Sequence, residues 1–256
     1  MLLLSFSYQV LHEGAVFNFS KGYVFASAEV PLPESLSGKE VNAEVLGARF
    51  RKCLSLAKDK LEEAVLSYPV FPDARFSQVV SNQTRALLKL VISSARVSDI
   101  SLDESRMRVE IAVPLYGESG LYHLLLEDEN FKKIKASYLM TYRERCRNRS
   151  FKKIRSVRVE VPANITLPLF PVFVDGKGEC LFSTALVAEG KILSSGPAVF
   201  LEVGEGFEGH VKQGKYADYI VLESPSIPAK SVFAKGTIFL IFGSRSSESD
   251  QQEGGN

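Results

Sequence analysis

Residues 105–126 read SRMRVEIAVPLYGESGLYHLLL, and this stretch is the most informative part of the sequence. Its first half alternates apolar and polar residues, which is typical of a β-strand with one buried face. Pro114 ends the strand, and Leu115-Tyr116-Gly117 turns the chain out of it. The stretch contains no residue pattern that indicates catalysis. The alternating apolar residues are Met107, Val109, Ile111 and Val113.

The segments before this strand predict a small antiparallel sheet with helices on one face. Aromatic-rich runs on either side of Ser20-Lys21-Gly22 are typical of a β-hairpin. Apolar residues at helical spacing predict a long helix, which Pro69 and Pro72 end. These segments follow one another in the order β-β-α-α-β-β. A further helix is predicted after them, over 121–140. The expected elements are the hairpin 16–19 and 23–26, helices over 40–67 and 76–90, and strands at 96–100 and 106–113.

From Val157 onward the sequence changes to short apolar runs separated by turn residues, which predicts a small all-β domain. The clearest hairpin signal is Asp175-Gly176-Lys177-Gly178, which joins strands at 172–174 and 180–182. The fold class is therefore α+β. Further strands are expected at 157–161, 199–203, 219–222, 232–233 and 237–242, with Gly204, Gly206, Gly209 and Gly214 in loops. The predicted organisation is an α/β domain at 1–140, a basic connector at 141–156, a β-rich domain at 157–243 and a disordered tail at 244–256.

Composition excludes few classes of protein. A chain of 256 residues, 45% of them hydrophobic, can bury a core, and a formal net charge of +1 gives no overall attraction to nucleic acid. Cys53 falls in a helical pattern, where it is expected to be a buried small hydrophobic residue. A disulfide between Cys146 and Cys180 stays open, because their separation in sequence does not define their geometry. The cysteines therefore do not define the compartment.

The N-terminus allows two interpretations. Residues 1–4 are apolar and Ser5-Phe6-Ser7 resembles a signal-peptide cleavage site, but no basic segment precedes them and the apolar run is short. Either the chain carries the end of a signal whose start lies upstream, or these residues form the first β-strand. The first case predicts a periplasmic or outer-membrane-associated protein, and the second a cytoplasmic one. No later stretch predicts a transmembrane helix.

Residue types that carry enzymatic chemistry are present but scattered. His12, His123 and His210 fall in different elements and are expected to be exposed or structural, so no metal site is predicted. The sequence has no nucleophile elbow, no Walker phosphate loop and no dinucleotide-binding glycine motif. Asp128 and Glu129 are expected to pair with lysines along a helix. We therefore expect a protein that is not an enzyme, with no catalytic residue, no metal and no cofactor.

Basic residues gather in the predicted connector. The cluster continues to Arg158, and Glu144 is its one acidic neighbour. It is either a solvated connector or a contact for an anionic surface, such as lipid headgroups, cell-wall polymer or nucleic acid. Aromatic residues are sparse in it, which argues against stacking on single-stranded nucleic acid, so no specific nucleic-acid partner is expected. The arginines expected to make contact are Arg143, Arg145, Arg147 and Arg149.

Residues 17–26, 95–97 and 109–117, in their order and spacing, resemble the Lpp-twenty lipoprotein family of bacterial envelopes, which is similar to the N-terminal part of the flagellar assembly protein FlgT. Residues 17–26 resemble the opening aromatic hairpin of this family, residues 95–97 the start of its central strand and residues 109–117 its closing strand. The alanine-rich long helix of the family would lie at Ala43, Ala48, Ala57 and Leu61. The chain departs from the family because no cysteine near its start offers a lipidation site, and residues 159–164 do not match a later family segment.

The resemblance implies a non-enzymatic role in interaction or assembly at the cell envelope, with a flagellar association as one form of that role. The expected partner is an envelope protein or a second copy of the chain, added at an exposed strand edge. Tyr116, Tyr122 and the connector arginines are the expected contact residues, and a core position is the alternative for both tyrosines. The competing hypothesis is a small-ligand-binding module with an apolar cleft between the domains or between helix and sheet. The residues that would line the latter cleft are Phe17, Phe25, Leu56 or Ile111.

Overall fold

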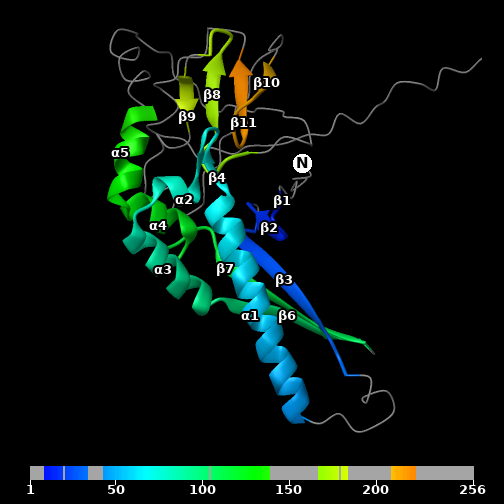
Figure 1. Ribbon diagram of the computed structural model, residues 1–256. Helices are drawn as coiled ribbons and strands as arrows, with labels where there is room; N and C mark the ends of the chain where they lie inside the picture. The colour runs from blue at the N-terminus through cyan, green and yellow to red at the C-terminus, as the bar shows by residue number, and fades with distance from the viewer. Residues whose placement is uncertain are drawn as a thin grey trace, which may run out of the picture.

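The computed structural model describes residues 9–19, 21–33, 43–103, 105–138, 167–178, 180–183 and 209–222. These residues form an α+β fold, as the sequence predicts, with a five-stranded antiparallel sheet and helices packed against it (Figure 1). No helix among them is both long enough and apolar enough to cross a membrane.

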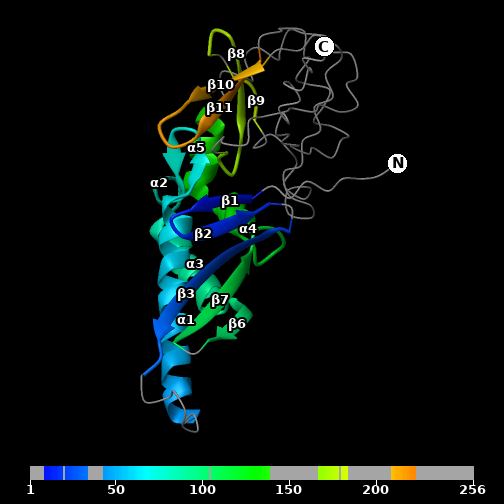
Figure 2. The ribbon, with the colours of Figure 1, turned by 90° about the vertical axis from the view of Figure 1, so that its right-hand side faces the viewer.

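The five-stranded sheet has the order β1-β2-β3-β7-β6, and every neighbouring pair is antiparallel. In Figure 2 the strands lie in front and helices α1 and α3 lie behind them. The predicted hairpin at 16–26 is confirmed as β2 and β3, and the alternating strand at 106–113 is confirmed as β7. The strand bounds are β1 Gln9–His12, β2 Ala15–Asn18, β3 Tyr23–Pro31, β6 Arg96–Leu102 and β7 Arg106–Pro114.

Alternation along β7 gives the sheet one buried face. Val109, Ile111 and Val113 have no exposed surface, whereas Arg108 on the opposite face is exposed. Burying an aliphatic side chain of this size contributes about 1.5–3 kcal/mol of stability. The apolar residues that predict the strand are therefore the residues that hold the helices on the sheet.

Helix α1, Ala43–Ser67, lies along this buried face. Its buried residues include Cys53, Ala57 and Ala64, whose small side chains let the helix approach the strands closely. The Sγ of Cys53 lies 2.8 Å from the carbonyl oxygen of Ala28 in β3. Cys53 is a free and fully buried thiol, which confirms the prediction made for it.

The helix predicted over 76–90 is two helices in the structure. Ser81 divides them as the N-cap of the second, since its hydroxyl oxygen accepts a hydrogen bond from the backbone N–H of Thr84 at 3.2 Å. The prediction also ends this segment too early, because Ile92 extends its buried stripe by another turn. The helix bounds are α2 Phe76–Val79 and α3 Asn82–Ser93.

The helix predicted over 121–140 is also divided. Asp128 separates its two parts, and its Oδ1 accepts a hydrogen bond from the backbone N–H of Phe131 at 2.9 Å, as an N-cap does. The expected lysine pairing is wrong for Asp128, because its carboxylate accepts hydrogen bonds from backbone N–H groups instead. Glu129 does pair with Lys132, at 3.0 Å. The helix bounds are α4 Leu121–Glu127 and α5 Glu129–Tyr138.

Asp128 also connects α5 to α3. Its Oδ2 accepts a hydrogen bond from the backbone N–H of Ser81 at 2.8 Å. Burial alone would raise the pKa of this carboxyl group, but hydrogen bonds from Thr84, Ser81 and Phe131 outweigh burial and lower the pKa to about 2. The carboxylate is therefore ionised at neutral pH although the residue is only 3% exposed.

A short hairpin follows α1, where the sequence predicts only the end of the helix. A segment almost 100 residues later adds to this hairpin, because the backbone N–H of Leu169 donates to the carbonyl oxygen of Pro69 at 2.9 Å. The N–H of Phe170 donates in the same way to Val70, also at 2.9 Å. The hairpin strands are β4 Pro69–Phe71 and β5 Ala74–Arg75.

The described part of the C-terminal region contains a four-stranded sheet in the order β10-β11-β8-β9. The predicted hairpin at 172–182 and the strand at 219–222 are confirmed, whereas the loop predicted at Gly209 is wrong, because a strand begins there. The strands predicted at 157–161, 199–203, 232–233 and 237–242 lie outside the described residues. The strand bounds are β8 Val172–Asp175, β9 Cys180–Ser183, β10 Gly209–Gln213 and β11 Asp218–Leu222.

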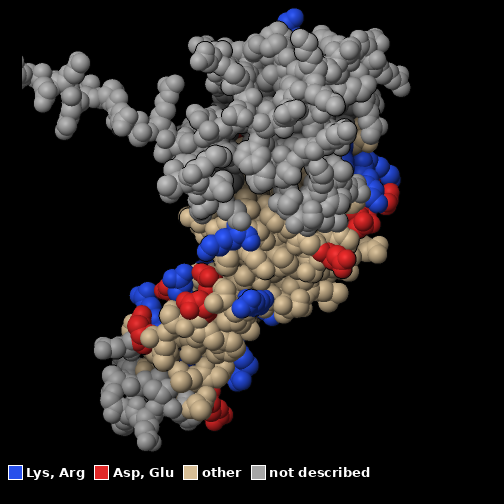
Figure 3. Space-filling model, turned by 180° about the vertical axis from the view of Figure 1, so that it is seen from behind, with Lys and Arg blue, Asp and Glu red and all other residues tan. Residues whose placement is uncertain are grey.

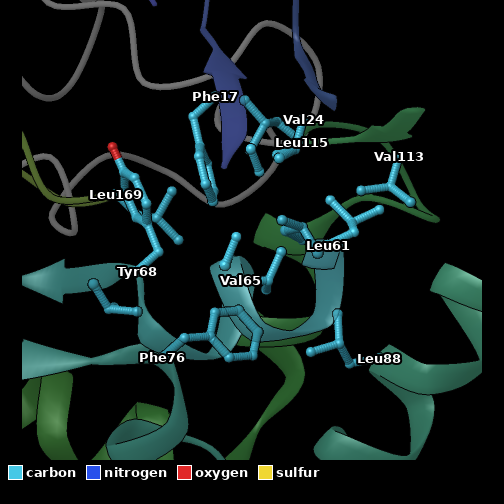
Figure 4. Close-up of a cluster of buried hydrophobic side chains, with 14 of the residues drawn as sticks. Phe17, Val24, Leu61, Val65, Tyr68, Phe76, Leu88, Val113, Leu115 and Leu169 are labelled. Carbon is cyan, nitrogen blue, oxygen red and sulfur yellow. The ribbon is translucent and has the colours of Figure 1, made fainter. Parts of the chain in front are cut away.

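Side chains from distant parts of the sequence share one hydrophobic core (Figure 4). Phe17 stacks on Tyr68 with ring centroids 3.8 Å apart, and the Tyr68 hydroxyl donates to the carbonyl oxygen of Leu167 at 2.8 Å. Leu169 is buried in the same cluster as Leu61 of α1. Residues 167–170 thus pack against the helices and the sheet, while the predicted domain boundaries themselves stay predictions.

Candidate functional site

Strand β6 forms one edge of the five-stranded sheet. It pairs with β7 on one side, and no residue in the described ranges pairs with its other side. Ile100 is 54% exposed and Leu102 is 52% exposed. Figure 3 shows the molecule from behind, where charged groups border wide uncharged areas of the described surface. Folded proteins usually protect such an edge, so exposed apolar residues there mark β6 as a candidate contact surface.

The hydrogen bonds of the β6–β7 hairpin define which backbone groups point outward. The N–H of Asp103 donates to the carbonyl oxygen of Arg106 at 3.0 Å, so these two residues form a hydrogen-bonded pair. Bonded and non-bonded positions alternate along an antiparallel ladder. Leu102 and Ile100 therefore occupy non-bonded positions, and their N–H and C=O groups point away from β7.

The apolar side chains of β6 lie on one face of the sheet. Ile100 and Leu102 lie opposite residues of β7 that face α1. The ladder is shifted between Val97 and Asp99, which leaves Ser98 as an extra residue and places Val97 on the same face as Ile100. The edge therefore combines free backbone groups with apolar side chains at the same positions. The side chains on the opposite face are Arg96, Ser98, Asp99 and Ser101, and the Ser98 hydroxyl donates there to Glu110 at 2.8 Å.

Asp103 fixes a negative charge beside the end of β6. Its Oδ1 accepts hydrogen bonds from the backbone N–H groups of Ser105 at 2.7 Å and Arg106 at 2.6 Å, and from the Ser105 hydroxyl at 3.0 Å. These bonds, first of all the one from the Ser105 N–H, lower the pKa of the Asp103 carboxyl group below its usual value. Arg96 carries a positive charge at the other end of the strand.

The two tyrosines expected to make contact stack on each other, with ring centroids 5.5 Å apart. Tyr122 has no exposed surface, and its hydroxyl donates to the carbonyl oxygen of Leu169 at 2.6 Å. Tyr116 is half-buried and donates to the carbonyl oxygen of Phe19 at 3.1 Å, and burial raises the pKa of its hydroxyl. Tyr122 is a core residue, which is the alternative that the sequence left open, and Tyr116 keeps part of its ring at the surface.

The expected contact arginines, Arg143, Arg145, Arg147 and Arg149, lie outside the described residues. Their contact with an anionic surface stays a prediction. Cys146 also lies outside the described residues, so the disulfide with Cys180 is neither supported nor contradicted. Among the described residues, the candidate site lies on the sheet.

His12 and Ser67 form a pair that resembles part of a catalytic site, at a distance of 2.9 Å between Nε2 and Oγ. The Ser67 hydroxyl also lies 3.2 Å from the carbonyl oxygen of Ala64, and when it donates to that oxygen Nε2 is the donor toward Ser67. Burial lowers the pKa of His12, and Phe17 and Tyr68 stand edge-on to its ring. The pair joins β1 to the end of α1, a structural role.

The other two histidines are in separate elements. His123 lies in α4 with a buried Nδ1 that has no hydrogen-bond partner in the described part of the chain, and His210 lies in β10. Among the described residues, no three His, Cys, Asp or Glu side chains are close enough to hold a metal ion. These residues therefore offer no metal centre.

The space expected to form a cleft between α1 and the sheet contains packed side chains. Phe17 and Ile111 have no exposed surface and belong to the core cluster (Figure 4). Phe25 is half-buried on the opposite face of the sheet, and Leu56 is exposed on α1, so the four residues do not line one space. Helix α3 also exposes Leu87, by 43%, and Leu90, by 64%, but a helix has no free backbone edge with which a partner strand could pair.

Comparison of the sequence with protein-family models and with curated proteins found no match. The candidate site is therefore argued from the described residues, and edge strand β6 is the surface that they support best.

Proposed function

We propose that this chain is a non-enzymatic interaction or assembly protein of the bacterial cell envelope and that β6 is its contact strand. The proposal rests on one observation about edge strand β6. At Ile100 and Leu102, the same residues have outward backbone groups and exposed apolar side chains. A partner strand that pairs with this edge gains main-chain hydrogen bonds and covers the apolar side chains at the same time.

The packing of the core favours this role over small-ligand binding. A ligand-binding module needs a concave pocket with a few polar groups aimed into it. The space between α1 and the sheet is filled by side chains of the hydrophobic core. Phe17, Leu61 and Ile111 belong to this core and are fully buried. Ile100 and Leu102 expose apolar side chains at the sheet edge, where they suit a macromolecular partner.

The envelope location in this proposal depends on the resemblance of residues 17–26 and 109–117 to the Lpp-twenty family. A flagellar association is a narrower form of the same proposal. The connector arginines would add a second contact, toward an anionic surface, through their positive charge.

A photo-reactive amino acid in place of Leu102 tests the location and the contact strand in one experiment. Cells are irradiated and fractionated, and mass spectrometry then identifies the crosslinked products and the mature N-terminus of the chain. We expect crosslinked products in the periplasmic or membrane-associated fraction, from a chain cleaved near Ser7, because the side chain at position 102 faces the partner.

The same photo-reactive residue in place of Leu90 is the matched control, since Leu90 is at least as exposed but offers no free strand edge. Equal crosslinking from both positions, or none from position 102, would contradict the role of β6. An intact chain that starts at Met1 in the cytoplasmic fraction would contradict the envelope location.

A further inference from the structure

We infer that the partner of β6 is a second copy of this chain, paired edge to edge and antiparallel across a twofold axis at Ile100. The inference rests on the proposed function, because it names the occupant of the contact strand. Two copies of the sheet would then form one continuous sheet, with the helices of both copies on the same face.

The backbone of β6 favours this register. A twofold axis through an antiparallel pair places one residue opposite itself, and that residue must have outward N–H and C=O groups to form two hydrogen bonds. Ile100 meets this requirement, because its position in the β6–β7 ladder is non-bonded. An axis at Asp99 would make Asp99 a non-bonded pair with its own copy, where side chains are closest, and would set two carboxylates against each other. An axis at Leu102 would leave most of β6 without a partner.

The side chains on the helix-facing side match in this register. Ile100 lies opposite Ile100 of the second copy, and Leu102 approaches Val97 across the bulge at Ser98. The two copies together would cover six apolar side chains, three from each strand. On the opposite side of the sheet Asp99 lies opposite Ser101, so no like charges face each other there.

The charges at the two ends of β6 are complementary in the same register. Arg96 of one copy lies opposite Asp103 of the other, and the symmetry makes this pair twice. The carboxylate of Asp103 is held in place by its turn hydrogen bonds. Charges and a bulge normally protect an edge strand from pairing with other strands. In the register centred on Ile100, the charges face opposite charges and the bulge at Ser98 lies beside Leu102 of the other copy.

The contact is smaller than a standard interface, because a single edge strand of seven residues takes part from each copy. We therefore expect a reversible dimer, with a dissociation constant in the range of about 10–100 μM. Such a dimer forms where the chain is locally concentrated, as it is in an assembly.

Sedimentation velocity of the purified full chain at increasing concentration measures the dimer. Variants at position 100 test the register, because residue 100 of one copy would lie opposite residue 100 of the other. Ile100→Lys and Ile100→Glu each place two like charges across the axis, and we expect each to weaken the dimer at least about tenfold. A one-to-one mixture of these two variants should recover the dimer, because opposite charges then face each other. Leu90→Lys and Leu90→Glu are the matched controls and should dimerise like the unaltered chain.

Ile100→Pro is an independent variant, which removes the outward N–H and leaves the bonds to β7 in place. We expect it to remain monomeric, with an unfolding midpoint close to that of Ile100→Val, which should still dimerise. An unaltered chain that stays monomeric up to about 1 mM would overturn the inference, as would undiminished dimerisation of Ile100→Lys. A monomeric chain that crosslinks through position 102 to a different protein would overturn the inference and leave the proposed function standing.

Discussion

Phe170→Ala is expected to lower the free energy of unfolding by about 3–5 kcal/mol. The ring of Phe170 has no exposed surface and lies 5.8 Å from Phe71, 5.3 Å from Phe131 and 5.2 Å from Tyr122, between ring centroids. Removing it leaves a cavity and ends three aromatic contacts at once. The effect would show that residues 167–170 belong to the core beside the helices.

Guanidinium unfolding of the full chain, followed by circular dichroism, measures this loss. Phe25→Ala is the matched control, since Phe25 is only half-buried on the open face of the sheet and should cost less. A change of less than about 1 kcal/mol for Phe170→Ala would contradict the packing of residues 167–170 against β4.

Asp128→Ala is expected to lower the free energy of unfolding by about 2–4 kcal/mol at pH 7. The substitution removes the acceptor for the backbone N–H groups of Ser81 and Phe131 and also removes the N-cap of α5. Each buried donor that loses its partner costs about 1–3 kcal/mol. Because the same carboxylate holds the start of α3 and the start of α5, both helices should lose stability together.

The effect of Asp128→Ala should depend on pH. The pKa of Asp128 is about 2 in the folded chain and about 3.9 in an unfolded one, so its charge stabilises the fold fully only above about pH 5. This contribution, on the order of 2–3 kcal/mol, is lost as the pH falls from about 5 toward 2. Unfolding curves of the variant and of the unaltered chain should therefore converge over that range.

Glu129→Ala is the matched control for this pH dependence, because Glu129 is the neighbouring carboxylate and its side chain is largely exposed. We expect its unfolding curves to stay close to those of the unaltered chain from pH 7 to pH 3. A constant difference between Asp128→Ala and the unaltered chain at every pH would show that the charge of Asp128 does not stabilise the helices.

Local patterns in the sequence predict the sheet well but not the ends of the helices. Val109, Ile111 and Val113 show the strand directly, because alternation records which face is buried. Ser81 and Asp128 look like ordinary polar residues on a helix, and only their capping bonds reveal that a helix begins there. The one local sign of these helix starts is that Ser81 and Asp128, both residue types that favour N-caps, come shortly before a helical apolar pattern.

The candidate site depends on long-range contacts that the sequence does not record. Exposed strand edges are expected from the sequence, but β6 becomes an edge because β7 pairs with β3 on its other side. The apolar residues Val97, Ile100 and Leu102 do not alternate regularly, since Ser98 is an extra residue, and this irregular spacing was the one local signal of the bulge. Similarly, nothing near Tyr122 predicts its hydrogen bond to Leu169.

Amide hydrogen exchange of β6, measured by NMR on the purified chain in dilute and concentrated solution, reports directly whether a second copy pairs with this edge. The N–H groups of Ile100 and Leu102 point outward, so they should exchange quickly in dilute solution and become protected as the concentration rises. The N–H of Ser101 bonds to β7 and should be protected in both. Fast exchange of Ile100 and Leu102 at every concentration up to about 1 mM would contradict pairing of this edge with a second copy.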